Sequence, residues 1–251
     1  MGAVTGAVLT SRTEDWQPWP LPLLLLALAI ASDHFAIETR RIRISATHFA
    51  LVVAMVLLGP APAVAIGLAS TIVDSVRARA PRDFVIINLG VYAAYPLVGS
   101  LAFRAIESQL GLDSDGTSLL LVVFGIYLLT NVMNFLMVVA PVCALDGVSL
   151  WARTKAMFIP LIPAELAIGL LAVGVVAVYE TVGLTALVLC TVVVFTFQYL
   201  LRELLTSQSR AEALEVRGRQ LASLQLGVIS ALMHTLDLRD RMTARHCAAV
   251  A

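Results

Sequence analysis

The chain has 251 residues, of which 59% are hydrophobic and 14% are charged. A soluble globular domain has about a quarter of its residues charged, so this composition excludes an ordinary soluble domain and predicts an integral membrane protein. Because the formal net charge is +0, the chain offers no basic surface to a nucleic acid, and we expect no nucleic-acid partner.

The N-terminal segment, residues 1–20, is a polar lead whose end is rich in Trp and Pro, residues that suit a membrane interface. The apolar run that follows, residues 21–31, is short for a bilayer. It can be a spanning helix or the core of a cleavable signal peptide. The signal peptide is the weaker alternative, because Arg40, Arg41 and Arg43 would then remain on the translocated side.

Six further apolar segments predict helices in the membrane. They lie at residues 44–58, 61–76, 84–103, 118–144, 157–179 and 182–200. The first two are short and are separated by Gly59-Pro60, so they form either two tilted spanning helices or a re-entrant hairpin. We therefore predict an all-α fold, a polytopic membrane helix bundle of about seven spans, two of them short.

The positive charges between these segments predict the orientation. Alternate loops carry most of the Lys and Arg residues, namely Arg40, Arg41, Arg43, Arg77, Arg79, Arg82, Arg153 and Lys155. The other side of the bilayer receives only Arg12 and Arg104. Since Lys and Arg are retained in the cytoplasm, we expect a multi-pass protein of the inner (plasma) membrane with its N-terminus outside and its C-terminus in the cytoplasm.

Four polar residues inside the apolar segments are candidates for binding a ligand. Glu165 follows Pro163 within an apolar run, where a lipid-exposed carboxylate would be costly, so we expect it to face the bundle interior, to be paired or to be protonated. Asn88, Asn131 and Asn134 can line the same interior, and the last two share a helix face. The alternative for each Asn is a hydrogen bond to a neighbouring helix only.

A charged helix is predicted after residue 200, and a heptad fits it. One apolar row comprises Leu200, Ser207, Leu214, Leu221 and Val228, and the other comprises Leu204, Ala211, Gly218, Gln225 and Leu232. This pattern predicts a parallel two-stranded coiled coil over residues 200–232 and hence a homodimer. The alternative is an amphipathic linker helix that docks on its own domain.

The last residues indicate a second cytoplasmic element. Thr243 is a plausible N-cap for a new helix starting at Ala244, which would place His246 in the first turn. By itself, this pattern also fits a polar residue on a helix.

Residues 238–246, which read LRDRMTARH and follow an amphipathic helix, are similar to the opening of the HD-GYP branch of the HD metal-dependent phosphohydrolases. The resemblance implies that His246 is the first metal ligand. It also implies a pair of divalent transition metals, Fe or Mn, and hydrolysis of a cyclic dinucleotide, cyclic di-GMP above all, in the intact protein. Met242 stands where some members have an acidic ligand, which favours a two-metal site. The later family motifs do not occur here, so we expect neither a catalytic residue nor a bound metal within these residues.

The domains predicted from these patterns are a membrane sensor or anchor at residues 1–200, a linker helix at 201–225 and the start of an HD-GYP-like domain at 226–251. The expected function is the sensory and regulatory region of a cyclic-dinucleotide phosphodiesterase that responds to an unknown small-molecule or membrane signal. The alternative is a transporter or a substrate-binding membrane subunit with a short cytoplasmic tail.

Overall fold

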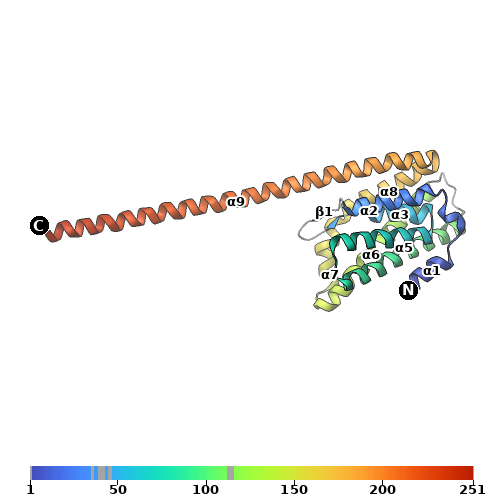
Figure 1. The fold of residues 1–251 in the computed structure, drawn as a ribbon, viewed down its shortest axis with the longest axis horizontal. Helices are drawn as coiled ribbons and strands as arrows, with labels where there is room; N and C mark the ends of the chain where they lie inside the picture. The colour runs from blue at the N-terminus through green and yellow to red at the C-terminus, as the bar shows by residue number, and fades with distance from the viewer. Residues whose placement is uncertain (1, 35–36, 39–42, 45–46, 112–115, 251) are drawn as a thin grey trace. The chain divides into compact units, whose positions relative to one another are not determined.

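The structure is a computed structural model that describes residues 2–34, 37–38, 43–44, 47–111 and 116–250. The chain divides into two compact units, Met1–Tyr199 and Leu200–Ala251. Most of the described residues are helical, and β1 (Ile37–Glu38) and β2 (Arg43–Ile44) pair antiparallel with Ile37 opposite Ile44. The predicted all-α class is confirmed (Figure 1).

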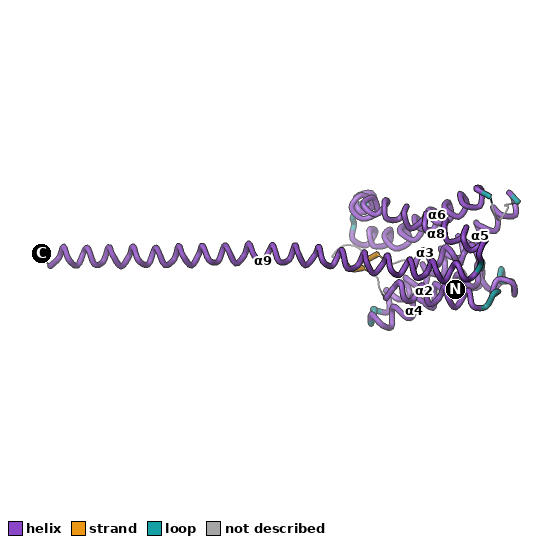
Figure 2. Tube along the Cα trace, turned by 90° about the horizontal axis from the view of Figure 1, so that it is seen from above, coloured by secondary structure: helices purple, strands orange, loops and turns teal. Residues whose placement is uncertain are grey.

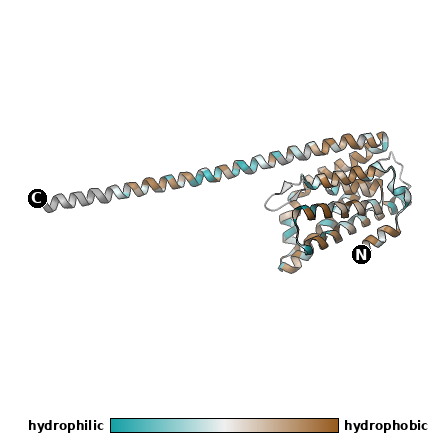
Figure 3. Ribbon diagram, viewed as in Figure 1, coloured by the Kyte–Doolittle hydropathy of each residue, from teal (hydrophilic) through white to brown (hydrophobic). Residues whose placement is uncertain are grey.

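Four helical stretches are long and apolar enough to cross a membrane. They are Pro60–Ala78 (α4), Arg82–Leu110 (α5), Thr117–Asp146 (α6) and Leu150–Val182, the last of which contains α8 (Ile162–Val182). Three shorter apolar helices accompany them, Pro20–His34 (α2), Thr47–Leu57 (α3) and Leu187–Thr196, which is part of α9. Each of the seven predicted apolar segments therefore overlaps an apolar helix, and the four long helical stretches indicate a multi-pass membrane protein (Figure 3).

Helix α3 forms the centre of the first unit. Every residue from Phe49 to Met55 is at most 2% exposed, so this helix is buried on all sides. It packs against α2, α4, α5, α6 and α8 (Figure 2). Its end is set by Gly59, whose φ of 95° favours glycine, and Pro60 then begins α4. The predicted break at Gly59-Pro60 is thus confirmed.

The N-terminal segment differs from the predicted polar lead. Residues Gly2–Leu9 form helix α1, which packs on α4 and α5, and Ala7 is 3% exposed beside Val64 and Ala93. The segment is helical because it consists of small and apolar residues, which allow close contact between helices. A short 3-10 turn, Thr13–Trp16, then connects α1 to α2.

Helix α9 extends from Leu184 to Val250 as one α-helix of 67 residues. It contains the last apolar segment, the heptad segment and the residues that resemble an HD-GYP opening. The predicted N-cap is wrong, because Thr243 lies within the helix. The physical reason is that residues 228–250 include neither Gly nor Pro and are rich in the helix formers Ala, Leu and Arg.

Candidate functional site

A polar cavity with a volume of about 320 Å³ lies in the first unit. Residues near the C-terminal ends of α2 and α4, near the N-terminal ends of α3, α5 and α8, and on the second half of α6 line it. Hydrophilic side chains supply much of the wall, which is unusual for the interior of so apolar a protein. They are Asp33, Thr47, His48, Thr71, Asp74, Ser75, Asn88, Asn131, Asn134 and Glu165, together with Tyr92 and Tyr127.

All four residues that the sequence singled out as ligand-binding candidates line this one cavity. Asn88 comes from α5, Asn131 and Asn134 come from α6, and Glu165 comes from α8. The expectation that Glu165 faces the bundle interior agrees with this placement. That these four residues bind a ligand stays a prediction. The structure shows that they line the same cavity, and it does not identify a molecule that binds there.

Glu165 is held by two donors from α6. Its Oε2 accepts a hydrogen bond from the Tyr127 hydroxyl at 2.6 Å and another from the Asn131 amide. Tyr127 and Asn131 are four residues apart, so they share one face of α6. An O–H···O distance of 2.6 Å lies within the range of charge-assisted hydrogen bonds to a carboxylate. Glu165 also stands in the first turn of α8.

The chain before α8 is an irregular helix that contributes to the cavity wall. Thr154–Phe158 form a π-helical turn and Ile159–Leu161 a 3-10 turn. Prolines at positions 160 and 163 lack an N–H group, which prevents the regular α-helical ladder here. Phe158 lines the cavity, and its ring centroid lies 4.7 Å from that of Phe135 on α6. The irregular turns thus supply an aromatic wall beside Glu165.

His48 is a site residue that the sequence reasoning missed. It lies at the start of α3, with its ring 5.1 Å from the ring of Tyr127 and 5.4 Å from that of Tyr95. Its Nε2 is 3.3 Å from Thr130 Oγ1, which itself donates to the Ile126 carbonyl at 2.7 Å. Because the Thr130 hydroxyl proton is already used, Nε2 is the donor and Nδ1 is an acceptor. Nδ1 is buried and has no hydrogen-bond partner among the described residues. A lone polar residue in the apolar run of α3 was the available signal.

The two aspartates of the cavity stand at helix ends. Asp33 is on the last turn of α2 and Asp74 on the last turn of α4. The Arg77 guanidinium lies 2.7 Å from the Nδ1 atom of His34, at the end of α2.

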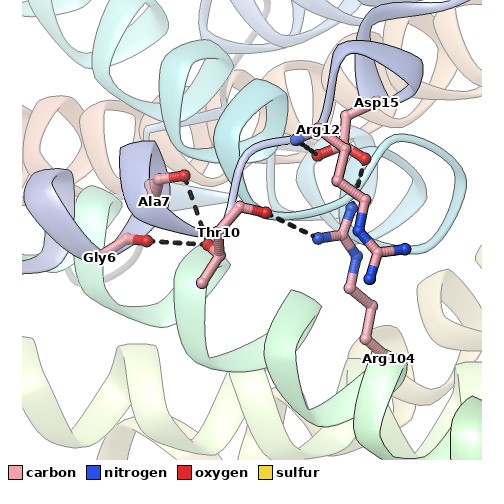
Figure 4. A network of polar contacts seen from close by, with 6 residues as sticks. All are labelled: Gly6, Ala7, Thr10, Arg12, Asp15 and Arg104. Atoms are coloured by element: carbon pink, nitrogen blue, oxygen red, sulfur yellow. Dashed lines mark hydrogen bonds and ion pairs between the residues drawn. The ribbon is translucent and has the colours of Figure 1, made fainter.

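A second polar cluster lies at the opposite end of the unit (Figure 4). Arg104 on α5 pairs with Asp15, whose side chain is only 5% exposed, and donates to the Thr10 carbonyl at 3.1 Å. Asp15 also accepts a hydrogen bond from the Arg12 backbone N–H at 2.9 Å. These contacts join the segment between α1 and α2 to α5. The role of this cluster is structural.

The predicted metal ligand, His246, lies near the end of α9, and its side chain is outside the described residues. Among the side chains that the structure describes, no group of three or more His, Cys, Asp or Glu residues could hold a metal ion. The metal pair that the resemblance implies stays a prediction for the intact protein.

The geometry of the polar cavity suits reversible binding of a small molecule. A carboxylate is fixed by two donors, amides surround it, and aromatic rings cover one side, which is typical of small-molecule sites. Comparisons of the chain with protein-family models, with curated proteins and with solved structures find no match.

Proposed function

We propose that this chain is the membrane-anchored sensory and regulatory region of a cyclic-dinucleotide phosphodiesterase. In this proposal the polar cavity is the sensory site, and α9 transmits its state to a cytoplasmic phosphohydrolase domain that begins near residue 226. The observation that carries the proposal is the uninterrupted course of α9 from Leu184 to Val250. The same helix contains an apolar membrane segment and the residues that resemble an HD-GYP opening.

The orientation in the membrane follows from the distribution of charge. Helices α4 and α5 meet at the cavity end, and Arg77, Arg79 and Arg82 stand there. Arg104 belongs to the opposite end, where it contacts the N-terminal segment. With seven crossings, the positive-inside rule places the cavity end in the cytoplasm and the N-terminus outside. Arg40 and Arg41, which support the same orientation, lie outside the described residues.

A short path links the cavity to α9. Glu165 is in the first turn of α8, α8 ends at Val182, and Gly183 alone separates it from Leu184, the first residue of α9. Gly183 has a φ of 77°, so the connection is a tight turn and not a flexible loop. A ligand that moves Glu165 relative to α6 therefore moves α8 as a rigid helix, and α9 must follow.

Dimerisation through residues 200–232 is the proposed means of transmission. Within the second unit, the heptad residues Leu204, Leu214, Leu221, Val228 and Leu232 are 55–66% exposed. An apolar row of this kind is stabilised when it packs against a second copy. Ser207, Gly218 and Gln225 interrupt the row, which weakens the coiled coil and allows its register to change.

The chemical part of the proposal concerns the residues around His246. The resemblance supports hydrolysis of cyclic di-GMP at a pair of divalent metals, Fe or Mn, of which His246 binds one. The remaining ligands would come from parts of the intact protein that are not in this sequence. When bound, such metals activate a water molecule for attack on the phosphodiester.

The test compares two neighbouring positions in the intact protein. His246→Ala removes a nitrogen ligand, so metal per chain and cyclic di-GMP hydrolysis should both fall by about tenfold or more. Met242→Ala is the matched control one helical turn away, and it should change neither, because a thioether is a poor ligand for such metals. Elemental analysis and turnover are measured on protein of matched helicity. Full metal content and activity in His246→Ala would refute the hydrolase assignment.

The second candidate function is transport, and the polar cavity favours it, because transporters also place polar sites within a helix bundle. Glu165 and the three asparagines would then bind the substrate. Reading the coding sequence beyond Ala251 separates the two functions. A His-Asp pair followed by Gly-Tyr-Pro supports the phosphodiesterase, and a stop codon or an unrelated tail supports the transporter.

A further inference from the structure

We propose that the polar cavity binds a small organic cation that carries an ammonium group, with the Glu165 carboxylate as its counter-ion. This inference supplies the ligand class for the proposed sensory role. It concerns the cavity alone and applies equally if the chain is a transporter.

The first argument concerns hydrogen-bonding groups. The donors that reach Glu165, Tyr127 and Asn131, both bond Oε2, so Oε1 has no protein donor among the described residues. Oε1 therefore remains able to accept a hydrogen bond from a ligand in the cavity that Glu165 lines. A buried acceptor without a partner destabilises the protein. An ammonium group has three donors and no acceptor, so it can donate to Oε1 of Glu165 and to the hydroxyl and amide oxygens of other lining residues.

The second argument concerns charge. Glu165 is a carboxylate in an apolar bundle, and the partners that hold it are neutral. Among the described residues that line the cavity, none is Lys or Arg. A charge in such a position is stabilised by an opposite charge, and the open side of Glu165 faces the cavity. The ligand therefore carries the positive charge.

The third argument concerns the aromatic wall. Phe84, Phe135 and Phe158 line the cavity, and the last two have their ring centroids 4.7 Å apart. Tyr92 and Tyr127 add two more rings. Ring faces attract cations, and their apolar area packs against the hydrocarbon part of an amine. A carboxylate beside several rings is thus suited to an ammonium group attached to an apolar body.

The volume limits the size of the ligand. A cavity of about 320 Å³ holds about ten water molecules at roughly 30 Å³ each, which corresponds to a ligand of roughly ten non-hydrogen atoms. A cyclic dinucleotide is several times larger, so the cavity would not enclose one completely.

Three probes that share a phenyl ring test the charge directly. They are phenethylamine, which is a cation, 2-phenylethanol, which is neutral, and phenylacetate, which is an anion. Binding to the full chain in lipid nanodiscs is measured by isothermal titration calorimetry. We expect phenethylamine to bind, and the other two probes to bind about tenfold more weakly or not at all, because they lose the charge-assisted bond to Glu165.

Two glutamate variants then locate the site. Glu165→Gln keeps the size of the side chain and should weaken phenethylamine binding by about tenfold or more. Glu180→Gln is the matched control on the exposed far end of α8 and should leave it unchanged. If Glu165→Gln does not fold, Glu165→Asp provides the test, because the shorter side chain keeps the negative charge and moves it away from the ligand.

Three results would overturn the inference: no binding of phenethylamine, equal binding of the three probes, or equal affinity in the cavity variant and Glu180→Gln. These binding measurements do not depend on cyclic di-GMP hydrolysis. Failure of the cation assignment therefore leaves the His246 experiment informative, and failure of the His246 experiment leaves the cation assignment standing.

Discussion

Gly67 should be indispensable for the contact between α4 and α5. A Cβ atom at this position would lie 2.6 Å from the Tyr92 carbonyl oxygen and 3.6 Å from Leu51 Cδ2. The first contact is with backbone, so it cannot be relieved by a rotamer change, and the two helices would have to separate by several tenths of an ångström. Overpacking of this kind destabilises a protein by about 1–3 kcal/mol.

Gly67→Ala also gains helix propensity, about 0.8–1.0 kcal/mol relative to glycine. Gly90→Ala is the matched control, because Gly90 lies in α5 and a Cβ there would meet nothing within 4 Å. The propensity gain is common to both variants, so their difference isolates the clash. We expect Gly67→Ala to be less stable than Gly90→Ala by about 1–3 kcal/mol. Unfolding by SDS in mixed micelles, followed by circular dichroism, measures both. If Gly67→Ala were as stable as Gly90→Ala, the close α4–α5 packing would be wrong.

Three further predictions address topology, dimerisation and the N-terminal cluster. In intact cells, a membrane-impermeant thiol reagent should label Ser114→Cys and not Arg79→Cys, and the reverse would invert the proposed orientation. Leu214→Cys should cross-link between two copies more than Glu215→Cys, which is displaced by one position. Equal cross-linking yields would contradict a coiled coil with a fixed register. Asp15→Asn should destabilise the first unit by about 3–5 kcal/mol, because it leaves the partly buried Arg104 guanidinium without its charge partner. The same SDS unfolding checks this value, and an unchanged midpoint would refute the structural role of the pair.

The sequence predicted where the helices lie in the chain, but it did not predict which helices pack against one another. Runs of apolar residues and the Gly59-Pro60 break are local signals, and they placed the membrane helices to within a few residues. Lipid tails and a protein core are both apolar, so an apolar helix does not encode which side meets lipid and which meets protein. The complete burial of α3 therefore became visible only in the structure.

The same reason separates the site residues that were found from those that were missed. Glu165 and the asparagines stood out because polar groups inside a membrane are costly. Tyr127 gave no such signal, because tyrosine is common near membrane interfaces, and its role depends on which face of α6 meets α8. His48 gave a polar signal, but its contacts with the rings of Tyr95 and Tyr127 became visible only in the structure. Thr243 was misread because its residue type favours an N-cap, while the continuous ladder of α9 satisfies its backbone without one.

The helical α1 was missed for a different reason. Its sequence, GAVTGAVL, has no long apolar side chain until its end and is too short to form a stable helix alone. Packing on α4 and α5 provides the stabilisation. Local propensity could not reveal it, because the decisive contacts come from helices more than fifty residues away.

The central claim is that the membrane unit controls a cytoplasmic phosphohydrolase through the rotation and register of α9. The most direct test inserts alanines between Gln208 and Ser209 and measures cyclic di-GMP hydrolysis by the intact protein in membranes. Seven residues rotate the distal helix by only about 20°, whereas two rotate it by about 200°. We predict that the seven-residue insertion keeps the wild-type rate and that the two-residue insertion changes the rate several-fold, with metal content equal in both. Equal rates for the two insertions would contradict the claim.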